Sequence, residues 1–366
     1  MTTTPIIIPI FLPNLGCRER CLFCNQKVTA KEIPSPLSVR GVIQASLAKL
    51  PSDKKRKKEV AFYGGTFTAI EKERQILYLK EVQPFLSSGL IDSVRISTRP
   101  DALDEEILSL LWEYGVRTVE VGAQSMIDQV LMLARRGHNA ENTICAVRRL
   151  RSWGFEVGIH LMIGLPGDSL QHFSKSLDRL TDLKPDFVRI HPTLVLKGAP
   201  LEKLWRDGGY SPLSLDEAVQ WLKRGVLQLE RASIPVARIG LQATKDLERS
   251  LLAGAYHPAL HQLVDSAIFF DMARSLLQLS PKNGSRVRFL CHPKEVSDLR
   301  GQRNENILRL KEEFKPSEIL IHESEVWPKG SLGLQTKEGR ILFHRRSLLR
   351  YHSLPEDRDV GPFLTG

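Results

Sequence analysis

Cysteine and long apolar runs are both scarce in this sequence, and each scarcity excludes a class of protein. Only five of the 366 residues are cysteine, and three of these fall within eight positions. An odd, clustered set argues against the disulfide framework of a secreted protein and favours metal binding in a reducing compartment. The apolar run near the start lacks a basic flank and is interrupted by Pro9 and Pro13, so it fits neither a signal peptide nor a membrane span. We therefore expect a cytoplasmic protein with no membrane partner.

The remaining composition is that of a globular protein with a large core. Hydrophobic residues make up 42% of the chain and charged residues 26%, and the net charge is +10. The positive charge favours polyanionic partners such as nucleic acid. No internal repeat or low-complexity tract interrupts the chain. A length above the roughly 100 to 200 residues of one domain predicts a main domain and a smaller one. The strand-helix rhythm gives way to a long helical stretch near residue 250, so we place the domains at 1–250 and 251–366.

Alternation of strand-like and helix-like segments predicts an α/β fold with a parallel sheet. Short runs rich in β-branched residues are predicted as strands at 6–11, 60–63, 94–98, 118–122, 157–163 and 187–192. Helical periodicity follows most of them, at 39–50, 71–86, 104–114, 140–153 and 170–183. Repeated βα units of this kind form a TIM-like barrel or part of one. Functional residues are then expected at the carboxyl ends of the strands, where the βα loops converge.

Three cysteines lie in the first of these loops. Cys17, Cys21 and Cys24 form the spacing CxxxCxxC directly after the first predicted strand. Three thiolates can each hold one iron of a 4Fe-4S cluster and leave the fourth iron open. A structural zinc site with a distant fourth ligand is the alternative. Cys145 and Cys291 are predicted to be ordinary buried thiols.

The second and third strands also end in short motifs. Gly64, Gly65 and Thr66 close the second strand, where a glycine pair is by itself typical of a turn. Ser97 and Arg99 close the third strand, where an arginine could form a forked contact with a carboxylate or simply precede the next helix.

The fourth strand carries polar residues inside an apolar run. Glu120 and Gln124 are either contacts for a cofactor or members of a buried hydrogen-bond network. The basic segment 135–138 that follows is either part of the site or an exposed turn.

Taken in order, these strand-end motifs resemble the radical S-adenosylmethionine (SAM) superfamily. Two later segments, FVRIHPTLVLKGAP and IPVARIGLQAT, are more specific. Residues 5–245 resemble the radical SAM portion of the Elongator catalytic subunit family, which acts on the wobble uridine of transfer RNA. The chain differs from that family in its shorter first cysteine gap and in lacking the acetyl-CoA-binding signature of an acetyltransferase domain. It is therefore most similar to short bacterial Elongator-like proteins, with anaerobic coproporphyrinogen oxidase as a more distant relative.

The resemblance implies a partial (β/α)6 TIM-like radical SAM barrel with a 4Fe-4S cluster on the three cysteines and SAM on the open iron. It further implies that Gly64, Gly65 and Thr66 receive the SAM amino group and Arg99 the SAM carboxylate. Ser97 stands where relatives carry a glutamate that contacts the ribose. The implied adenine contacts are Phe23, Ile163 and Gly164, and Glu120 and Gln124 are further cofactor contacts.

Three residues on later strands are candidates for contact with a substrate. His160 lies on the fifth strand, His191 lies on the sixth, and Lys197 follows the sixth. A satisfied core histidine is the alternative for His160, and a surface lysine is the alternative for Lys197.

The last third of the chain predicts a small α/β unit in the order βααβ. The connection between its helices contains Arg300, Gly301, Arg303 and Asn304, which resembles the GxxG loop of KH-type RNA-binding modules. Asn304 replaces the second glycine, and asparagine tolerates a positive φ better than most residues. A small α/β cap that binds no nucleic acid is the alternative.

Three functional hypotheses follow. The first is a radical SAM enzyme whose substrate is an RNA, most plainly transfer RNA, and whose electrons come from a donor such as ferredoxin or flavodoxin. The second is a radical SAM oxidase of a porphyrin-like or other small carboxylate substrate. The third is a non-catalytic nucleic-acid-binding protein with a structural metal site, which predicts no cleavage of SAM.

Overall fold

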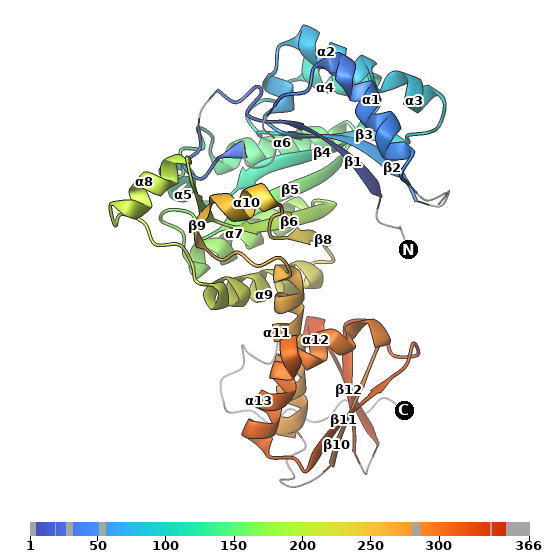
Figure 1. The fold of residues 1–366 in the computed structure, drawn as a ribbon, viewed down its shortest axis with the longest axis vertical. Helices are drawn as coiled ribbons and strands as arrows, with labels where there is room; N and C mark the ends of the chain where they lie inside the picture. The colour runs from blue at the N-terminus through green and yellow to red at the C-terminus, as the bar shows by residue number, and fades with distance from the viewer. Residues whose placement is uncertain are drawn as a thin grey trace. The chain divides into compact units, whose positions relative to one another are not determined.

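Seven parallel strands form the main sheet of the computed structural model, which describes residues 5–18, 20–26, 32–50, 56–279, 286–336 and 339–348. The sheet order is β1-β2-β3-β4-β5-β6-β8 (Figure 1). The strands are β1 (Ile6–Leu12), β2 (Lys58–Gly64), β3 (Ser93–Thr98), β4 (Val116–Gln124), β5 (Glu156–Ile163), β6 (Phe187–Pro192) and β8 (Val236–Ile239). The first six are those that the sequence predicts, and β8 adds a seventh at the edge.

Helices connect successive strands and pack on the outer face of the curled sheet (Figure 1). They are α1 (Pro36–Leu47), α2 (Lys72–Lys80), α3 (Gln83–Ser87), α4 (Glu105–Glu113), α5 (Asp128–Leu133), α6 (Ala140–Ser152) and α7 (Leu170–Leu183). Side-chain caps explain several starts, since Asp104, Asn139 and Ser169 each accept a hydrogen bond from a backbone N–H in the first turn. The prediction of a single helix over 71–86 is wrong, because the segment forms two helices. It is broken into α2 and α3 because Pro84, which lacks an N–H, sits in the first turn of α3.

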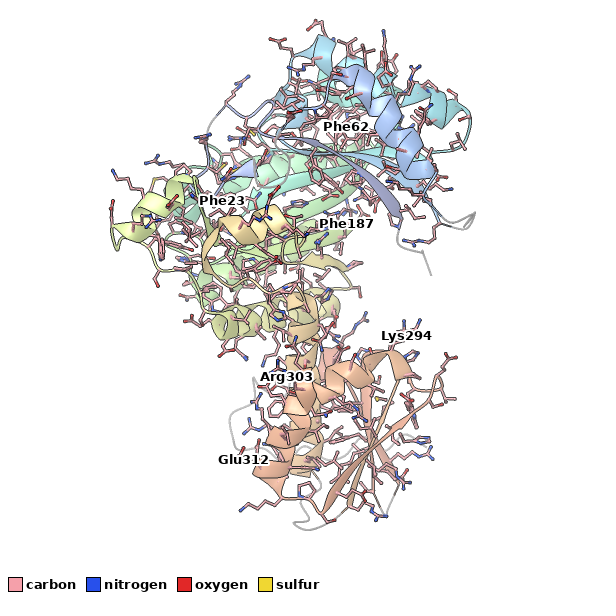
Figure 2. The ribbon with its side chains drawn as sticks, viewed as in Figure 1. Phe23, Phe62, Phe187, Lys294, Arg303 and Glu312 are labelled. Carbon is pink, nitrogen blue, oxygen red and sulfur yellow. The ribbon has the colours of Figure 1, made fainter. Side chains whose placement is uncertain are left out.

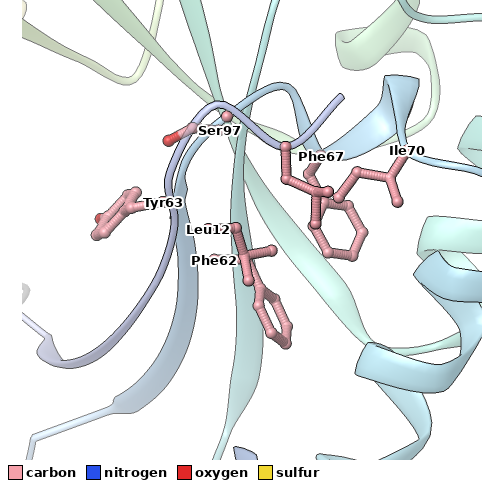
Figure 3. Close-up of a pocket in the computed structure, with 8 residues that line it drawn as sticks. Leu12, Phe62, Tyr63, Phe67, Ile70 and Ser97 are labelled. Atoms are coloured by element: carbon pink, nitrogen blue, oxygen red, sulfur yellow. The ribbon is translucent and has the colours of Figure 1, made fainter. Parts of the chain in front are cut away.

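The two faces of the sheet differ in chemistry. Outward side chains are apolar and packed by helices; the ring of Phe62 lies 5.1 Å from that of Phe67 and 5.8 Å from that of Tyr78. Figure 2 labels Phe62 in this layer, and Figure 3 shows Phe62 and Phe67 on one side of β2 and Tyr63 on the other. Because side chains alternate along a strand, the next residue, Tyr63, faces the interior of the half-barrel. The interior is therefore where polar groups accumulate.

Smaller elements surround the carboxyl ends of the strands. Strands β7 (Leu194–Leu196) and β9 (Leu251–Gly254) form an antiparallel pair, and α8 (Pro200–Arg206) and α10 (Lys245–Ser250) lie next to them in the chain. Leu194, Leu196 and Leu247 join one small apolar cluster.

The chain divides into two compact units. The described residues up to 218, together with 234–258, form the first, and 219–233 together with the described residues from 259 to 348 form the second. The predicted break at residue 250 thus lies close to the division at 258, while most of helix α9 (Leu215–Arg231) groups with the second unit.

The second unit is a mixed sheet with helices. Its further elements are α11 (Leu260–Leu279), β10 (Arg286–Cys291), α12 (Val296–Arg300), α13 (Glu305–Phe314), β11 (Glu318–Glu323), β12 (Ser331–Gln335) and β13 (Arg340–His344). The sheet order is β11-β10-β12-β13, with β10 and β11 parallel and the other pairs antiparallel. The expected βααβ order is present as β10, α12, α13 and β11. Within the described ranges, no helix is both long and apolar enough to cross a membrane.

Candidate active site

The cysteine loop is held against the end of β2 by close backbone contacts. The backbone N–H of Thr66 donates to the carbonyl of Leu15 at 2.8 Å. A Cβ added to Gly65 would lie 1.9 Å from that same carbonyl oxygen, and one added to Gly16 would lie 2.2 Å from the carbonyl oxygen of Thr66. Only glycine permits this approach. The two glycines therefore seat the loop that begins at Cys17 on the glycine-rich end of the neighbouring strand.

The three loop cysteines are free thiols and influence one another. Burial, and then the charges of Cys21 and Cys17, raise the pKa of the Cys24 thiol to about 12. The Sγ of Cys17 lies 3.5 Å from Thr66 Oγ1, and Arg136 donates from Nη1 to Cys21 Sγ at 3.0 Å. Because the thiolate is the form that ligates a metal, binding of a metal at Cys24 would release its proton.

The three thiols of this loop suit a 4Fe-4S cluster. Cys17, Cys21 and Cys24 are free, and in such a cluster each thiolate ligates a different iron and one iron stays open. The donor set of three thiols in one loop therefore fits the cluster that the sequence predicts.

Two buried side chains beside the loop were not clearly identified from the sequence. Arg136 and His138 are 6% and 8% exposed, so the exposed-turn interpretation of residues 135–138 is wrong for both. Arg136 Nε and both ring nitrogens of His138 are buried without a hydrogen-bond partner among the described atoms. Burial, and then the charge of Arg136, lower the pKa of His138 to about 4. Unpaired buried polar atoms call for an explanation, and a ligand at the barrel mouth supplies one.

Strand β3 ends in a fixed arginine and a small polar side chain. Arg99 donates from Nε and Nη2 to both carboxylate oxygens of Asp101, at 2.9 and 2.8 Å. A ligand carboxylate at Arg99 would therefore have to share or displace Asp101. Ser97 lines a small pocket together with Leu12, Tyr63 and Gly65 (Figure 3).

Glu120 is the centre of a buried charged network on the inner face. It accepts hydrogen bonds from Tyr63 Oη at 2.8 Å and Arg95 Nη1 at 3.0 Å, pairs with Arg189 at 3.0 Å, and contacts His160 Nε2. Burial raises the pKa of Glu120, but His160 and the two arginines outweigh it and lower the pKa to about 2. The structure thus places Glu120 in the protein network that the sequence left open as the alternative to a cofactor contact.

The network extends to Glu59 and to the later strands. Arg95 also donates to Glu59 at 2.7 Å. The rings of His160 and His191 lie 5.8 Å apart, so the structure brings these two substrate candidates together. Burial lowers the pKa of His191 to about 3, and its Nδ1 has no partner among the described atoms.

Four inner-face residues were missed by the sequence reasoning: Tyr63, Arg95, Arg189 and Arg238. The available signal was a polar residue at every second position of otherwise apolar strands.

The end of β5, like the end of β2, contains glycine and lies at the carboxyl-terminal edge of the sheet. Gly164 has φ +72°, its N–H donates to Asp168 Oδ2 at 3.0 Å, and its carbonyl accepts from Tyr210 Oη at 2.6 Å. Ile163 is fully buried. Phe23 packs on the apolar cluster of Val130, Ala134 and Leu165, which also receives Met162. Phe23 from the cysteine loop and Met162 near the end of β5 therefore pack on the same apolar cluster.

The remaining predicted residues lie at the rim. Gln124 ends β4 with φ +68°, and its Nε2 would lie 3.1 Å from a Cβ added to Gly122. Lys197 is exposed, and its backbone carbonyl accepts a hydrogen bond from Asn25 Nδ2 at 2.6 Å, just after the last cysteine of the loop.

The two cysteines outside the loop differ in exposure. Cys291 is buried as predicted, but Cys145 is exposed, so the prediction of a buried thiol is wrong for Cys145.

Comparison with known proteins agrees with this site. The profile of the radical SAM superfamily matches residues 12–180, and that of the radical SAM C-terminal domain matches residues 185–269. Together they cover more than half of the chain. The chain therefore belongs to the radical SAM superfamily of enzymes, whose cofactors are a 4Fe-4S cluster and SAM.

Within the superfamily, the chain is similar to proteins named for Elongator and for acetylation of tRNA uridine 34. The chain is 30% identical over 246 residues to a tRNA uridine(34) acetyltransferase of Methanocaldococcus infernus, covering 55% of this chain and 45% of the relative. It is 27% identical over 191 residues to human Elongator complex protein 3, covering 46% and 34%. The solved structure of M. infernus Elp3, lacking its N-terminus, aligns with a TM-score of 0.58 and 24% identity, covering 75% of this chain and 64% of that one. The chain spans about half the length, or less, of the acetyltransferase and Elongator relatives that it matches.

Proposed function

We propose that this chain is a radical SAM enzyme that cleaves SAM reductively and directs the resulting radical at an RNA substrate, with transfer RNA as the first candidate. The observation that carries the proposal is the cysteine loop, seated on the glycine end of β2 and surrounded by buried donors without partners. The similarity to proteins named tRNA uridine(34) acetyltransferase supports the choice of substrate.

The cysteines and the strand ends have separate roles in this proposal. Cys17, Cys21 and Cys24 would hold the cluster. Bound there, the cluster would supply the electron for reductive cleavage of SAM, the chemistry by which this superfamily takes a hydrogen atom from a substrate. Arg136, which donates to Cys21 Sγ, would stabilise the negative charge of the ligating thiolates.

The strand ends would orient SAM. The segment 64–66 would receive the amino group, Arg99 the carboxylate, and the mouth segment at Ile163 and Gly164 the adenine, beside Phe23. The apolar packing around Phe23 would exclude water from the radical. A reduced donor such as ferredoxin or flavodoxin would supply the electron, and we expect this chemistry to take place in the reducing cytoplasm.

Detection of 5′-deoxyadenosine tests the enzyme proposal. The full chain is reconstituted with iron and sulfide under anaerobic conditions and mixed with SAM and dithionite. We expect 5′-deoxyadenosine from the wild type and from Cys145→Ala, whose thiol is exposed and outside the loop. The variant with Cys17, Cys21 and Cys24 replaced by Ala should lose both the absorbance of the cluster and the product. A wild-type protein with an intact cluster spectrum and no product would refute the proposal.

The loop between α12 and α13 is the part of the second unit proposed to bind RNA. Gly301, Arg303 and Asn304 all have positive φ, so the chain turns tightly here. A Cβ on Gly301 would lie 3.0 Å from the side chain of Asn306. Arg300 and Arg303 are exposed on this loop (Figure 2 labels Arg303). Exposed guanidinium groups beside a tight backbone turn suit phosphate contacts.

Salt-dependent binding of tRNA tests this part separately. We expect Arg300→Ala/Arg303→Ala to weaken binding of labelled tRNA and to reduce the slope of log affinity against log salt by about 2, one per lost phosphate contact. Lys311→Ala/Lys329→Ala removes the same charge from exposed positions outside the loop and is the matched control. Equal losses in the two double variants would leave only non-specific attraction by net charge and would contradict a role for the loop.

A further inference from the structure

The inner face between β6 and β8 carries a positive charge that the described protein does not neutralise. Arg189 and Arg238 are register partners on these adjacent parallel strands, so their side chains point to the same face. Arg189 reaches Glu120 at 3.0 Å. Arg238 donates only to neutral oxygens, the carbonyl of Gly240 at 3.3 Å and Gln242 Oε1 at 3.4 Å. No carboxylate of the described residues forms an ion pair with Arg238.

The carboxylates on the inner face have other partners. Glu59 pairs with Arg95, and Glu120 is shared by Arg95 and Arg189. Glu156, on the same face at the start of β5, accepts a hydrogen bond from Thr118. Arg238 is therefore the inner-face arginine without a carboxylate partner among the described residues. Keeping an uncompensated charge in a partly buried site costs free energy, so a fold that retains one has a compensating partner in some state.

Unpaired donors lie in the same place as the excess charge. Arg189 Nε and His191 Nδ1 are both buried without a hydrogen-bond partner among the described atoms. His191 is two residues nearer the mouth than Arg189 on the same face of β6. Burial and the neighbouring Arg189 lower the pKa of Arg238, which shows that the two guanidinium groups feel each other. The group that this corner lacks is an acceptor with negative charge and several oxygens.

We propose that Arg189, Arg238 and His191 form a binding site for an anionic group of the substrate, a carboxylate or a phosphate, inside the half-barrel. The site deepens the proposed function and rests on it, because it gives the substrate of the same barrel a chemical class. It is separate from the cysteine loop and from the arginine at the end of β3. Arg189 would orient the anion while it remains paired with Glu120, and Arg238 would supply the uncompensated charge.

Binding of simple anions to the full reconstituted chain tests this site. The probes are inorganic phosphate, followed by line broadening in ³¹P NMR, and acetate, followed by its competition with phosphate. We expect Arg238→Gln to weaken binding about tenfold, the loss of one charge-assisted contact. Arg249→Gln removes an arginine that is 75% exposed in the same unit and should change nothing. Far-UV circular dichroism establishes that both variants are folded.

Saturating SAM separates a substrate site from a cofactor site. Phosphate binding that persists with SAM present supports the proposal, and phosphate binding abolished by SAM overturns it, because the arginines would then hold the SAM carboxylate. Equal binding in Arg238→Gln and the wild type also overturns it. If wild-type protein makes no 5′-deoxyadenosine while phosphate binding still depends on Arg238, the proposed function fails and the anion site stands. Binding of either probe supports the site. If phosphate binds more tightly than acetate, the substrate group is a phosphate, and if acetate binds more tightly, it is a carboxylate.

Discussion

Replacing Glu120 by Gln should destabilise the first unit more than any exposed charge substitution. Glu120 has no exposed side-chain surface and is shared by Arg95, Arg189 and His160 from three other strands. Glutamine keeps the shape but removes the charge, so two guanidinium groups lose their common carboxylate. Breaking a buried ion pair from one side costs about 3 to 5 kcal/mol.

The depressed pKa of Glu120 has its cause in the same contacts and predicts how their contribution depends on pH. Lowering it from an ordinary value of about 4.3 to about 2 corresponds to about 3 kcal/mol of preference for the ionised form in the folded protein. Because the folded pKa is depressed, this stabilisation is present above the unfolded pKa and is lost as the pH falls through about 2. The two routes agree on a loss of about 3 kcal/mol at neutral pH.

Urea denaturation followed by circular dichroism measures the effect. Glu105→Gln is the matched control, because Glu105 is 68% exposed and also pairs with an arginine, at 3.4 Å; it should cost less than about 1 kcal/mol. The wild-type advantage over Glu120→Gln should shrink between pH 4.5 and 2. A free-energy loss below about 1 kcal/mol at pH 7, or an advantage independent of pH, would show that the network does not hold these strands together.

Three further substitutions have defined outcomes. Gly65→Ala places a Cβ 1.9 Å from the carbonyl oxygen of Leu15, so we expect it to displace the cysteine loop. A colorimetric assay should show that the variant binds less than half of the wild-type iron after reconstitution. Normal iron content would show that Gly65 is not needed to hold the loop against β2. Tyr210→Phe removes the 2.6 Å hydrogen bond to the carbonyl of Gly164. Equilibrium dialysis should show the affinity for SAM falling several-fold, in line with about 1 kcal/mol. An unchanged affinity would show that the Gly164 segment does not contact SAM. Asn306→Ala removes three hydrogen bonds, two of them buried, beneath the proposed RNA loop, and thermal denaturation should show the second unit losing about 1 to 3 kcal/mol.

The sequence predicted the elements of the barrel well because their signals are local. The helix predicted over 170–183 is α7, and six of the seven parallel strands were found from short apolar runs. Local signals did not suffice where a segment carried conflicting features, such as a proline within a helical pattern or buried side chains within a basic stretch. Pro84 breaks a helical pattern that is otherwise continuous. Residues 135–138 could belong to the site or to an exposed turn, and only the structure shows that Arg136 and His138 are buried. The edge strand β8 lies in the motif IPVARIGLQAT and was not among the predicted strands.

By itself, the sequence determined the family and the order of the motifs: a cysteine loop after the first strand and glycine-rich ends after the second and fifth. These depend on spacing along the chain, which residue types reveal directly. Tertiary structure alone decided which charges meet. Glu120 pairs with Arg95 and Arg189, Arg136 reaches Cys21 from 115 positions away, and Arg238 is left without a carboxylate among the described residues. The physical reason is that strand register and sheet order set these distances, and neither is encoded in any short stretch of sequence.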